Sequence, residues 1–214
     1  RDAIPSIDDP VFDTSYFGAP DDEVIVVDSD PPRAYPLRIL SYHEVVNDVI
    51  PRPKAPTDKS NGSAGESDQI AVTWCPICWS ALVYDRRVGD DVLTFGVSGK
   101  LADDSLVLYD RETESEWQQT SGRCLRGPLE GSRLSLRSSR LTTFGDFRDD
   151  HPHGLVLQPV RDGPGEAPER VYDMAPYERY RSRDAFGLHG MRGEGVPREW
   201  ERSDIDAKTV VIGV

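Results

Sequence analysis

The sequence predicts a mainly β protein, in which a sandwich or barrel-like antiparallel sheet carries a few short helices and long surface loops. Short apolar runs with alternating polar positions recur along the chain, for example in "DVLTFGVSG" and "SLVLYDRETESEWQQ". Gly122, Gly127 and Gly131 mark turns, and stretches with helical periodicity are scarce. Many short strands separated by turn residues are typical of all-β sandwiches and barrels.

The chain is predicted to begin with an arm and a hairpin. Residues 1–20 contain prolines and little periodicity, so we expect an extended arm. Two apolar runs then flank Asp28–Pro32 in "EVIVVDSDPPRAYPLRIL", which predicts a β-hairpin. Because Pro36 has no backbone N–H, the second strand should lie at a sheet edge or at a bulge.

A short helix and a loop should follow the hairpin. Ser41 is a possible N-cap with Glu44 three residues later, a capping box that would open a helix with His43 in its first turn. Residues 51–67, "PRPKAPTDKSNGSAGES", form a polar stretch that predicts a mobile loop. We interpret it as a loop within a single domain spanning residues 1–214.

The remaining elements surround two cysteines. In "QIAVTWCPICWSALVYDRRV", apolar flanks predict two strands, or a strand and a short turn, around the CPIC segment. Residues 162–201 are rich in Pro, Gly and Arg, which predicts an irregular segment wrapping the surface. The final "AKTVVIGV" predicts a last strand.

The charge of the chain excludes some classes of partner. A formal net charge of -13 would repel nucleic acids and anionic membrane surfaces, so we expect no nucleic-acid partner. The charge does not exclude a partner protein or self-association. Only four of the 25 basic residues are lysines, and an acidic, lysine-poor, halophilic surface of this kind suggests adaptation to high salt. The sequence contains no run of about 18 apolar residues, so we expect no transmembrane segment.

The CPIC segment allows three interpretations. Cys75 and Cys78 could chelate a soft ion such as copper or zinc, although a tetrahedral site needs two further ligands. They could instead cycle between dithiol and disulfide. The segment that follows, "WSALVYDRRV", favours a strand over the long helix of thioredoxin-like proteins. Thirdly, both could be plain buried residues, as we expect for Cys124.

Histidines are the candidate additional ligands. His43 is the best of them, since it lies about thirty residues before Cys75 beside Glu44. His151 and His153 would face one side of a strand, but the proline between them favours a solvated turn. His189, close to Met191, is a weaker candidate in the segment expected to wrap the surface.

Two segments, 84–86 and 109–111, share the residues Tyr-Asp-Arg. Cross-strand ion pairs are the simpler explanation for them. The functional alternative is a charged lining around the cysteine site. The residues that could surround that site are Asp85, Arg86, Tyr109 and Trp117.

Several motifs together resemble the DUF3179 family, a group of uncharacterised bacterial and archaeal proteins often found with export signals. They are "RDAIPSIDDPVF", "RAYPLRILSYHEVVND", "VTWCPICWSALVYDRRV", "LTFGVSGKL", "LVLYDRETESEWQQTSG" and "GPLEGSRL", with "DMAPYERY" and "TVVIGV" matching more loosely. The resemblance implies that recurrent family positions fall on His43, Cys75, Cys78, Asp85, Arg86, Ser98, Gly99, Tyr109, Asp110, Arg111 and Trp117. Trp79 departs from the small residue usual after the second cysteine, and its indole could shield the thiols.

We therefore expect an exported, extracytoplasmic acidic β domain, an expectation that follows from the resemblance and the missing initiator Met. In the leading hypothesis Cys75, Cys78 and His43 form a small copper or zinc site used in metal handling or metal-dependent redox chemistry. One alternative is a thiol-disulfide oxidoreductase in which an exposed Cys75 attacks. Another is a non-catalytic surface or assembly module with a structural Cys75–Cys78 pair.

Overall fold

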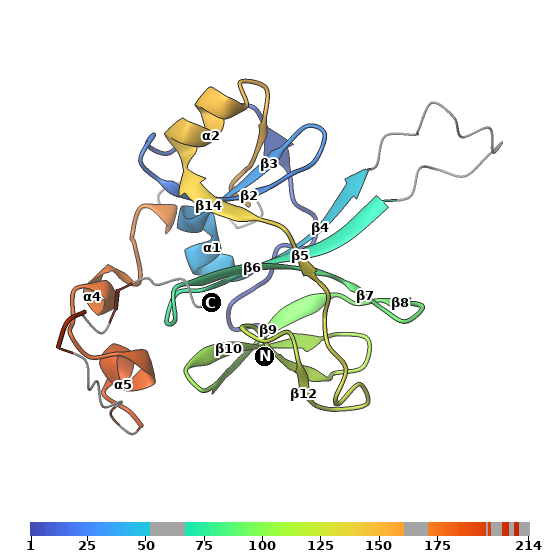
Figure 1. Ribbon diagram of the computed structural model, residues 1–214, viewed down its shortest axis with the longest axis vertical. Coiled ribbons are helices and arrows are strands. Elements are labelled where there is room, and N and C mark those ends of the chain that lie inside the picture. The colour runs from blue at the N-terminus through green and yellow to red at the C-terminus, as the bar shows by residue number, and fades with distance from the viewer. Residues whose placement is uncertain (52–66, 161–170, 196, 198–202, 206–207, 210–214) are drawn as a thin grey trace.

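The computed structural model describes residues 1–51, 67–160, 171–195, 197, 203–205 and 208–209. Their secondary structure is mainly β, as predicted, and the described strands form open sheets rather than a closed barrel. Figure 1 shows three of these sheets stacked in layers, which we name upper, central and lower after that view.

Neighbouring strands within a layer are often not consecutive in the sequence. The upper sheet contains β1 (Phe12–Asp13), β15 (Leu155–Leu157), β3 (Arg33–Pro36), β2 (Glu23–Val27) and β14 (Arg140–Thr143), in that order. The central sheet contains β13 (Leu136–Arg137), β6 (Ser80–Asp85), β5 (Ser67–Cys75) and β4 (Val45–Pro51). The lower sheet contains β12 (Cys124–Arg126), β11 (Glu116–Gln118), β10 (Ser105–Asp110) and β9 (Phe95–Ala102), and a small hairpin joins β7 (Arg87–Val88) to β8 (Asp91–Val92).

Four short helices are described. They are α1 (Leu37–His43), α2 (Phe144–Asp150), α4 (Glu178–Arg181) and α5 (Gly187–Arg192). In Figure 1, α1 lies between the upper and central sheets and α2 covers the outer face of the upper sheet. No helix among the described residues is long and apolar enough to cross a membrane.

The central sheet separates two hydrophobic cores because its side chains alternate between its faces. On β5, Ile70, Val72 and Trp74 pack into the core shared with the upper sheet and α1. Ala71 and Cys75 point into the core shared with the lower sheet. This alternation places the first cysteine between two sheets, where water is excluded.

The predicted capping box is wrong. The helix begins at Leu37, directly after Pro36, and ends at His43, so His43 lies in its last turn. Glu44 follows as the C-cap in the left-handed conformation, with φ at 57°. The apolar run before Ser41 packs on the core and draws the helix toward the N-terminus, while the valines after Glu44 enter β4.

The first hairpin is confirmed. The arm is largely irregular, and Ile7 pairs with Val46 in an isolated bridge. β2 pairs antiparallel with β3. Pro36 ends β3 beyond the two residues that pair with β15, so it lies at a strand end instead of a bulge or sheet edge.

The later predictions fall partly outside the described residues. The predicted loop 51–67 joins β4 to β5, and residues 52–66 lie outside the description. Within the predicted irregular segment 162–201, the described part contains α4 and α5, so it is more helical than expected. Of the predicted final strand, only Lys208 and Thr209 belong to the described part.

Candidate functional site

The two cysteines lie at a tight turn between adjacent strands. β5 ends at Cys75, β6 begins at Ser80, and these two residues pair across the hairpin. Trp79 closes the turn in the left-handed region, with φ at 52°. A bulky residue rarely adopts this conformation, so the turn carries backbone strain. The predicted strand–turn–strand arrangement around CPIC is confirmed.

The two thiols interact directly and differ in exposure. Cys75 is 1% exposed, whereas Cys78 is partly exposed. A hydrogen bond from the Cys75 thiol lowers the pKa of Cys78 to about 7. The same bond, together with burial, raises the pKa of Cys75 far above its usual range. The expectation that Cys75 is the exposed thiol is wrong, because β5 turns its side chain into the lower core.

A polar network supports Cys78. Its Sγ lies 3.1 Å from Oγ of Ser80, whose hydroxyl donates to Oε1 of Gln119 at 2.7 Å. The Ser80 hydroxyl can rotate toward a Cys78 thiolate, and both it and the Ser105 hydroxyl lower the pKa of Cys78. Ser105 Oγ is buried and has no other partner among the described residues. Gln119 is fully buried and fixes this arrangement by donating from Nε2 to Oγ1 of Thr73 at 3.1 Å.

Trp79 does not cover the thiols as expected. Its ring packs edge-on against Trp74, with ring centroids 4.8 Å apart, and belongs with the upper core. The Arg181 guanidinium lies over the Trp79 ring, 4.0 Å from its centroid. Because Trp74 and Cys75 are consecutive on a strand, they face opposite sides of the sheet, and Trp79 follows Trp74.

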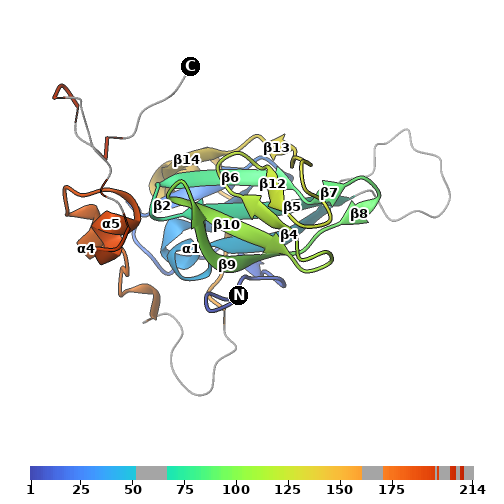
Figure 2. The ribbon, with the colours of Figure 1, turned by 90° about the horizontal axis from the view of Figure 1, so that it is seen from below.

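Residues 171–192, which we name the tyrosine segment, are held against the core by three tyrosines. Their hydroxyls lie at hydrogen-bonding distance from Nε2 of His43 (Tyr172, 2.8 Å), Oε1 of Glu44 (Tyr177, 3.1 Å) and the Ile77 carbonyl oxygen (Tyr180, 2.8 Å). Figures 1 and 2 both show α4 and α5 beside the end of the stacked sheets. The segment therefore contacts the CPIC turn itself through Tyr180.

Glu44 is a buried carboxyl group beside the end of β5. It is 5% exposed, and its carbonyl oxygen accepts a hydrogen bond from the Trp74 N–H at 2.8 Å. Burial raises the pKa of Glu44 to about 7, opposed by the hydrogen bond from Tyr177. Glu44 therefore changes charge near neutral pH, and its backbone is bonded to Trp74, the residue before Cys75 on β5.

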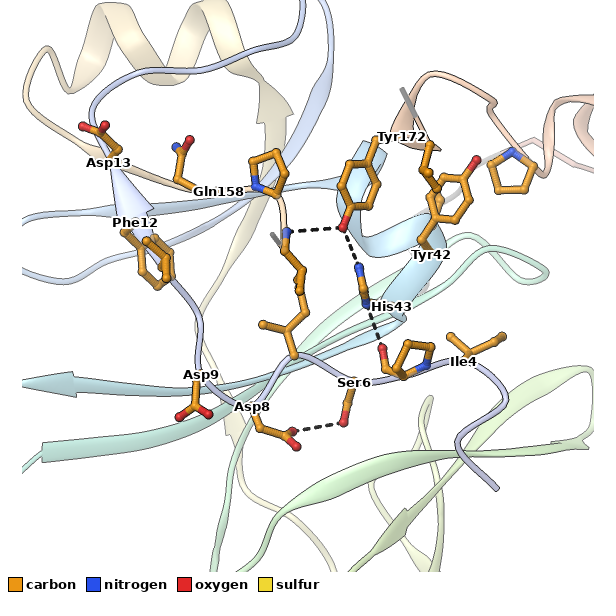
Figure 3. A pocket seen from close by; sticks show the side chains of 18 of the residues that line it. Ile4, Ser6, Asp8, Asp9, Phe12, Asp13, Tyr42, His43, Gln158 and Tyr172 are labelled. Carbon is orange, nitrogen blue, oxygen red and sulfur yellow. Dashed lines mark hydrogen bonds between the residues drawn. The ribbon is translucent and has the colours of Figure 1, made fainter. Parts of the chain in front are cut away.

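His43 lies in a different place, beside a cavity of about 1450 Å³. Figure 3 shows its ring between the Pro5 carbonyl oxygen, 2.8 Å from Nδ1, and the Tyr172 hydroxyl, 2.8 Å from Nε2. Because a carbonyl oxygen only accepts, Nδ1 carries the hydrogen and Nε2 accepts from Tyr172. Burial lowers the pKa of His43, so the imidazole is held neutral. Tyr177 also lines this cavity.

The predicted metal ligands are not all brought together. Among the residues that the structure describes, no three His, Cys, Asp or Glu side chains are grouped so that they could hold a metal ion. His151 lies 2.9 Å from a guanidinium nitrogen of Arg140, His153 is exposed in a turn, and His189 belongs to α5. Copper or zinc binding stays a prediction, for which the structure brings together two thiols as ligands.

The four residues predicted to surround the site occupy separate places. Asp85 accepts from the Arg87 N–H, and buried Arg86 donates to the Leu93 carbonyl oxygen at 3.1 Å. Tyr109 binds Asp2 of the arm. Trp117 alone shares the hydrophobic cluster of Cys75, and it donates to Asp110 at 2.8 Å. Cys124 is a buried thiol, as predicted.

Sequence reasoning missed the residues that contact the thiols. Ser80 follows Cys78 by two positions, but nothing in the sequence marks it as a neighbour. Gln119 and Ser105 come from the lower sheet and approach only when the sheets stack. The motif "DMAPYERY" does contain two of the three tyrosines, and it was the available signal.

The chain belongs to the DUF3179 family, whose description is a protein of unknown function; the family model matches residues 1–214. This match confirms the resemblance that the motifs carry, and it extends over the whole chain. No curated protein and no solved structure is significantly similar to it.

Proposed function

We propose that Cys75 and Cys78 form a redox-active dithiol that exchanges with a disulfide of its substrate. One observation carries this proposal: the CPIC turn leaves Cys78 the more accessible thiol, beside Cys75 and the Ser80 hydroxyl, and hydrogen bonds from these groups lower its pKa to about 7. The thiolate is the attacking species in thiol–disulfide exchange, and attack is fastest when its pKa is close to the ambient pH. Cys78 therefore attacks and Cys75 resolves.

The exchange proceeds in two steps. The Cys78 thiolate attacks one sulfur of a substrate disulfide, the substrate S–S bond breaks, and one substrate thiolate leaves. Cys75 then loses its proton and attacks Sγ of Cys78, which forms the intramolecular disulfide and expels the second substrate thiolate. Two electrons pass from the dithiol to the substrate, and the reverse sequence oxidises a substrate dithiol.

The surroundings suit this chemistry. The Ser80 and Ser105 hydroxyls can donate to a Cys78 thiolate, and both lower the pKa of Cys78. An N–H group of Leu106 points to Cys75 and favours its thiolate as well. Burial opposes ionisation of Cys75, so this thiol stays protonated until the mixed disulfide has formed.

The test uses a Cys124→Ser background, so that the CPIC thiols are the only ones present, in high-salt buffer. The reduced protein is mixed with 5,5′-dithiobis(2-nitrobenzoate), and release of the coloured thiolate is counted. We expect two equivalents from the dithiol. Cys75→Ser should release one equivalent and retain one nitrothiobenzoate group on Cys78 by mass spectrometry, whereas Cys78→Ser should react far more slowly.

Two results would overturn the proposal. In one, both thiols of the folded protein stay unreactive and react only after denaturation, as a plain buried pair would. In the other, the purified protein carries about one equivalent of copper or zinc that is lost in Cys75→Ser and Cys78→Ser, as the competing metal hypothesis predicts. A disulfide that resists reduction in the folded state would favour the structural cross-link instead.

A further inference from the structure

The cavity beside His43 has no part in the exchange steps above. It encloses about 1450 Å³, which exceeds the roughly 300–1,000 Å³ of most ligand pockets, so a small organic molecule fits in it. Its lining comes from four segments that are distant in the sequence: the arm between residues 3 and 15, the end of α1, residues 158–160 and the start of the tyrosine segment. Figure 3 shows these segments around one space. Neither Cys75 nor Cys78 is among the described residues of the lining.

The walls of this cavity are largely apolar and aromatic. The aromatic side chains of the lining are Phe12, Tyr42, Tyr172 and Tyr177. Two apolar side chains of the lining stay exposed, Val11 at 65% and Val171 at 42%. Exposed apolar side chains gathered at one hollow are typical of binding sites. The Tyr42 hydroxyl is buried and has no hydrogen-bond partner among the described residues, so the lining also contains an unsatisfied polar atom.

The formal charges of the lining are all of one sign. Three carboxylates line the cavity, from Asp8, Asp9 and Asp13. Among the described residues of the lining none is Lys or Arg, although the chain contains 25 of these residues. Both ring nitrogens of His43 are already engaged in hydrogen bonds. An anionic ligand would therefore meet charge of its own sign here, whereas a cation is complementary.

The three carboxylates differ in the partners that they already have. Asp8 forms an ion pair with Arg111, so its charge is balanced. Asp13 accepts a hydrogen bond from the adjacent Thr14 N–H at 2.6 Å, but it forms no ion pair among the described residues. Asp9 has neither a hydrogen bond nor an ion pair within the described part of the chain. Two carboxylates of the lining therefore lack a cation.

We propose that the cavity binds a small organic cation, an ammonium or guanidinium group attached to an apolar or aromatic body. The charged group pairs with Asp9 and Asp13 of the arm, and the body packs on the apolar and aromatic walls, where tyrosine rings also attract cations. The strand in the lining, β1, is only two residues long, too short to pair with an added peptide strand. A small molecule held by side chains therefore fits the cavity better than an extended peptide. This inference is independent of the dithiol exchange.

The experiment compares probes of similar shape and different charge. Isothermal titration calorimetry in high-salt buffer measures the affinity of the protein for phenethylamine, which is a cation, for neutral phenethyl alcohol and for anionic phenylacetate. Spermidine supplies positive charge without an aromatic ring. We expect phenethylamine to bind, and each of the other three probes to bind at least about tenfold more weakly. The high salt screens attraction by the net charge of -13 more than it screens a contact inside the cavity.

Variants at exposed positions locate the site without disturbing the core. The double variant Asp9→Asn, Asp13→Asn keeps the shape of both side chains and should weaken phenethylamine binding by about tenfold. The double variant Asp90→Asn, Asp91→Asn is the matched control, because it removes the same charge from the exposed β7–β8 hairpin, and it should change the affinity by less than about twofold. Val11→Thr replaces an exposed methyl group of the lining and should weaken binding by about threefold.

Three results would overturn the proposal. Phenethylamine could fail to bind, or bind no more tightly than the alcohol or phenylacetate. The two double variants could weaken binding equally, which would show that net charge alone attracts the amine. A basic peptide such as Lys-Phe-Lys could bind where phenethylamine does not, which would assign the cavity to a protein partner. Cys75→Ser and Cys78→Ser should leave phenethylamine binding unchanged, so failure of the dithiol exchange would not affect this site.

Discussion

The Tyr177 hydroxyl lies 3.1 Å from Oε1 of Glu44, and this contact joins the tyrosine segment to the end of the helix that precedes the central sheet. It places a half-buried phenol, which lines the cavity, against a buried carboxyl group.

Stability should depend on the protonation of Glu44. Its pKa is about 7 in the folded protein and 4.5 for an ordinary glutamate. Because the pKa of Glu44 is higher in the folded protein than in the unfolded chain, protonated Glu44 favours the folded state. This contribution to stability is fully present below pH 4.5 and is lost as the pH rises through 7. The difference corresponds to roughly 3 kcal/mol. We expect Glu44→Gln to be more stable than the wild type at pH 8, with the advantage gone at pH 4.5.

Urea denaturation of both proteins at several pH values, at constant high salt, measures this difference. The comparison with Glu44→Gln is necessary because His43 has a lowered pKa and acts with the opposite sign, gaining stability as the pH rises toward 6.5. A stability difference between the two proteins that does not change with pH would refute the assignment of a raised pKa to Glu44.

Cys78 should ionise near neutral pH because of Cys75. The rate of alkylation of Cys78 by iodoacetamide, followed by mass spectrometry, should rise with a midpoint close to pH 7. Cys75→Ala removes the hydrogen bond that contributes most to this low pKa, so the midpoint should move upward. Cys75→Ser retains a donor and should shift the midpoint less. Equal midpoints in the wild type and Cys75→Ala would show that the two thiols do not share a proton.

The tyrosine segment should restrict access to the CPIC turn. The Tyr180 hydroxyl donates to the Ile77 carbonyl oxygen at 2.8 Å and accepts from the Gly187 N–H at 3.0 Å. Tyr180→Phe leaves two buried backbone groups without this partner, at a cost of about 1–3 kcal/mol. We expect faster alkylation of Cys78 and faster amide exchange over residues 171–192. Tyr42→Phe, which loses no hydrogen bond among the described residues, should change neither.

The sequence predicted the class of fold because its signals are local. Alternating apolar positions along β5 and the prolines between β2 and β3 act within a few residues, so the hairpins that they indicate are present. The helix boundary failed where local and tertiary preferences compete. A capping box at Ser41 was available, but burying Leu37, Ile39 and Leu40 required the helix to start earlier.

The candidate site was predictable only in part, for a physical reason. The apolar segments on either side of CPIC predicted a turn between two strands, and a turn at this spacing brings Cys75 and Cys78 together. Which thiol faces solvent depends on the face of β5 that packs on the lower sheet, and that is decided by stacking of distant strands. His43 was assigned to the thiols by its distance along the sequence, yet the end of α1 directs its ring to Pro5 and Tyr172.

A buried ion pair between layers should matter far more to stability than an exposed one. Arg33 of β3 lies 2.6 Å from a carboxylate oxygen of Asp48 on β4, and the Tyr35 hydroxyl donates to the same carboxylate. Asp48→Asn leaves the largely buried Arg33 guanidinium, whose side chain is 14% exposed, without its counter-ion, so we expect a loss of about 3–5 kcal/mol in the free energy of unfolding. Asp150→Asn is the matched control.

Asp150 pairs with Arg140 at 3.2 Å, but both side chains are about half exposed, at 56% and 45%. Solvent and salt screen such a pair, so its loss should cost less than about 1 kcal/mol. Urea denaturation of the two variants in the same high-salt buffer measures both values. If Asp48→Asn were as mild as Asp150→Asn, the pair could not be what fixes the upper sheet to the central one, and the apolar core around α1 alone would hold these two layers together.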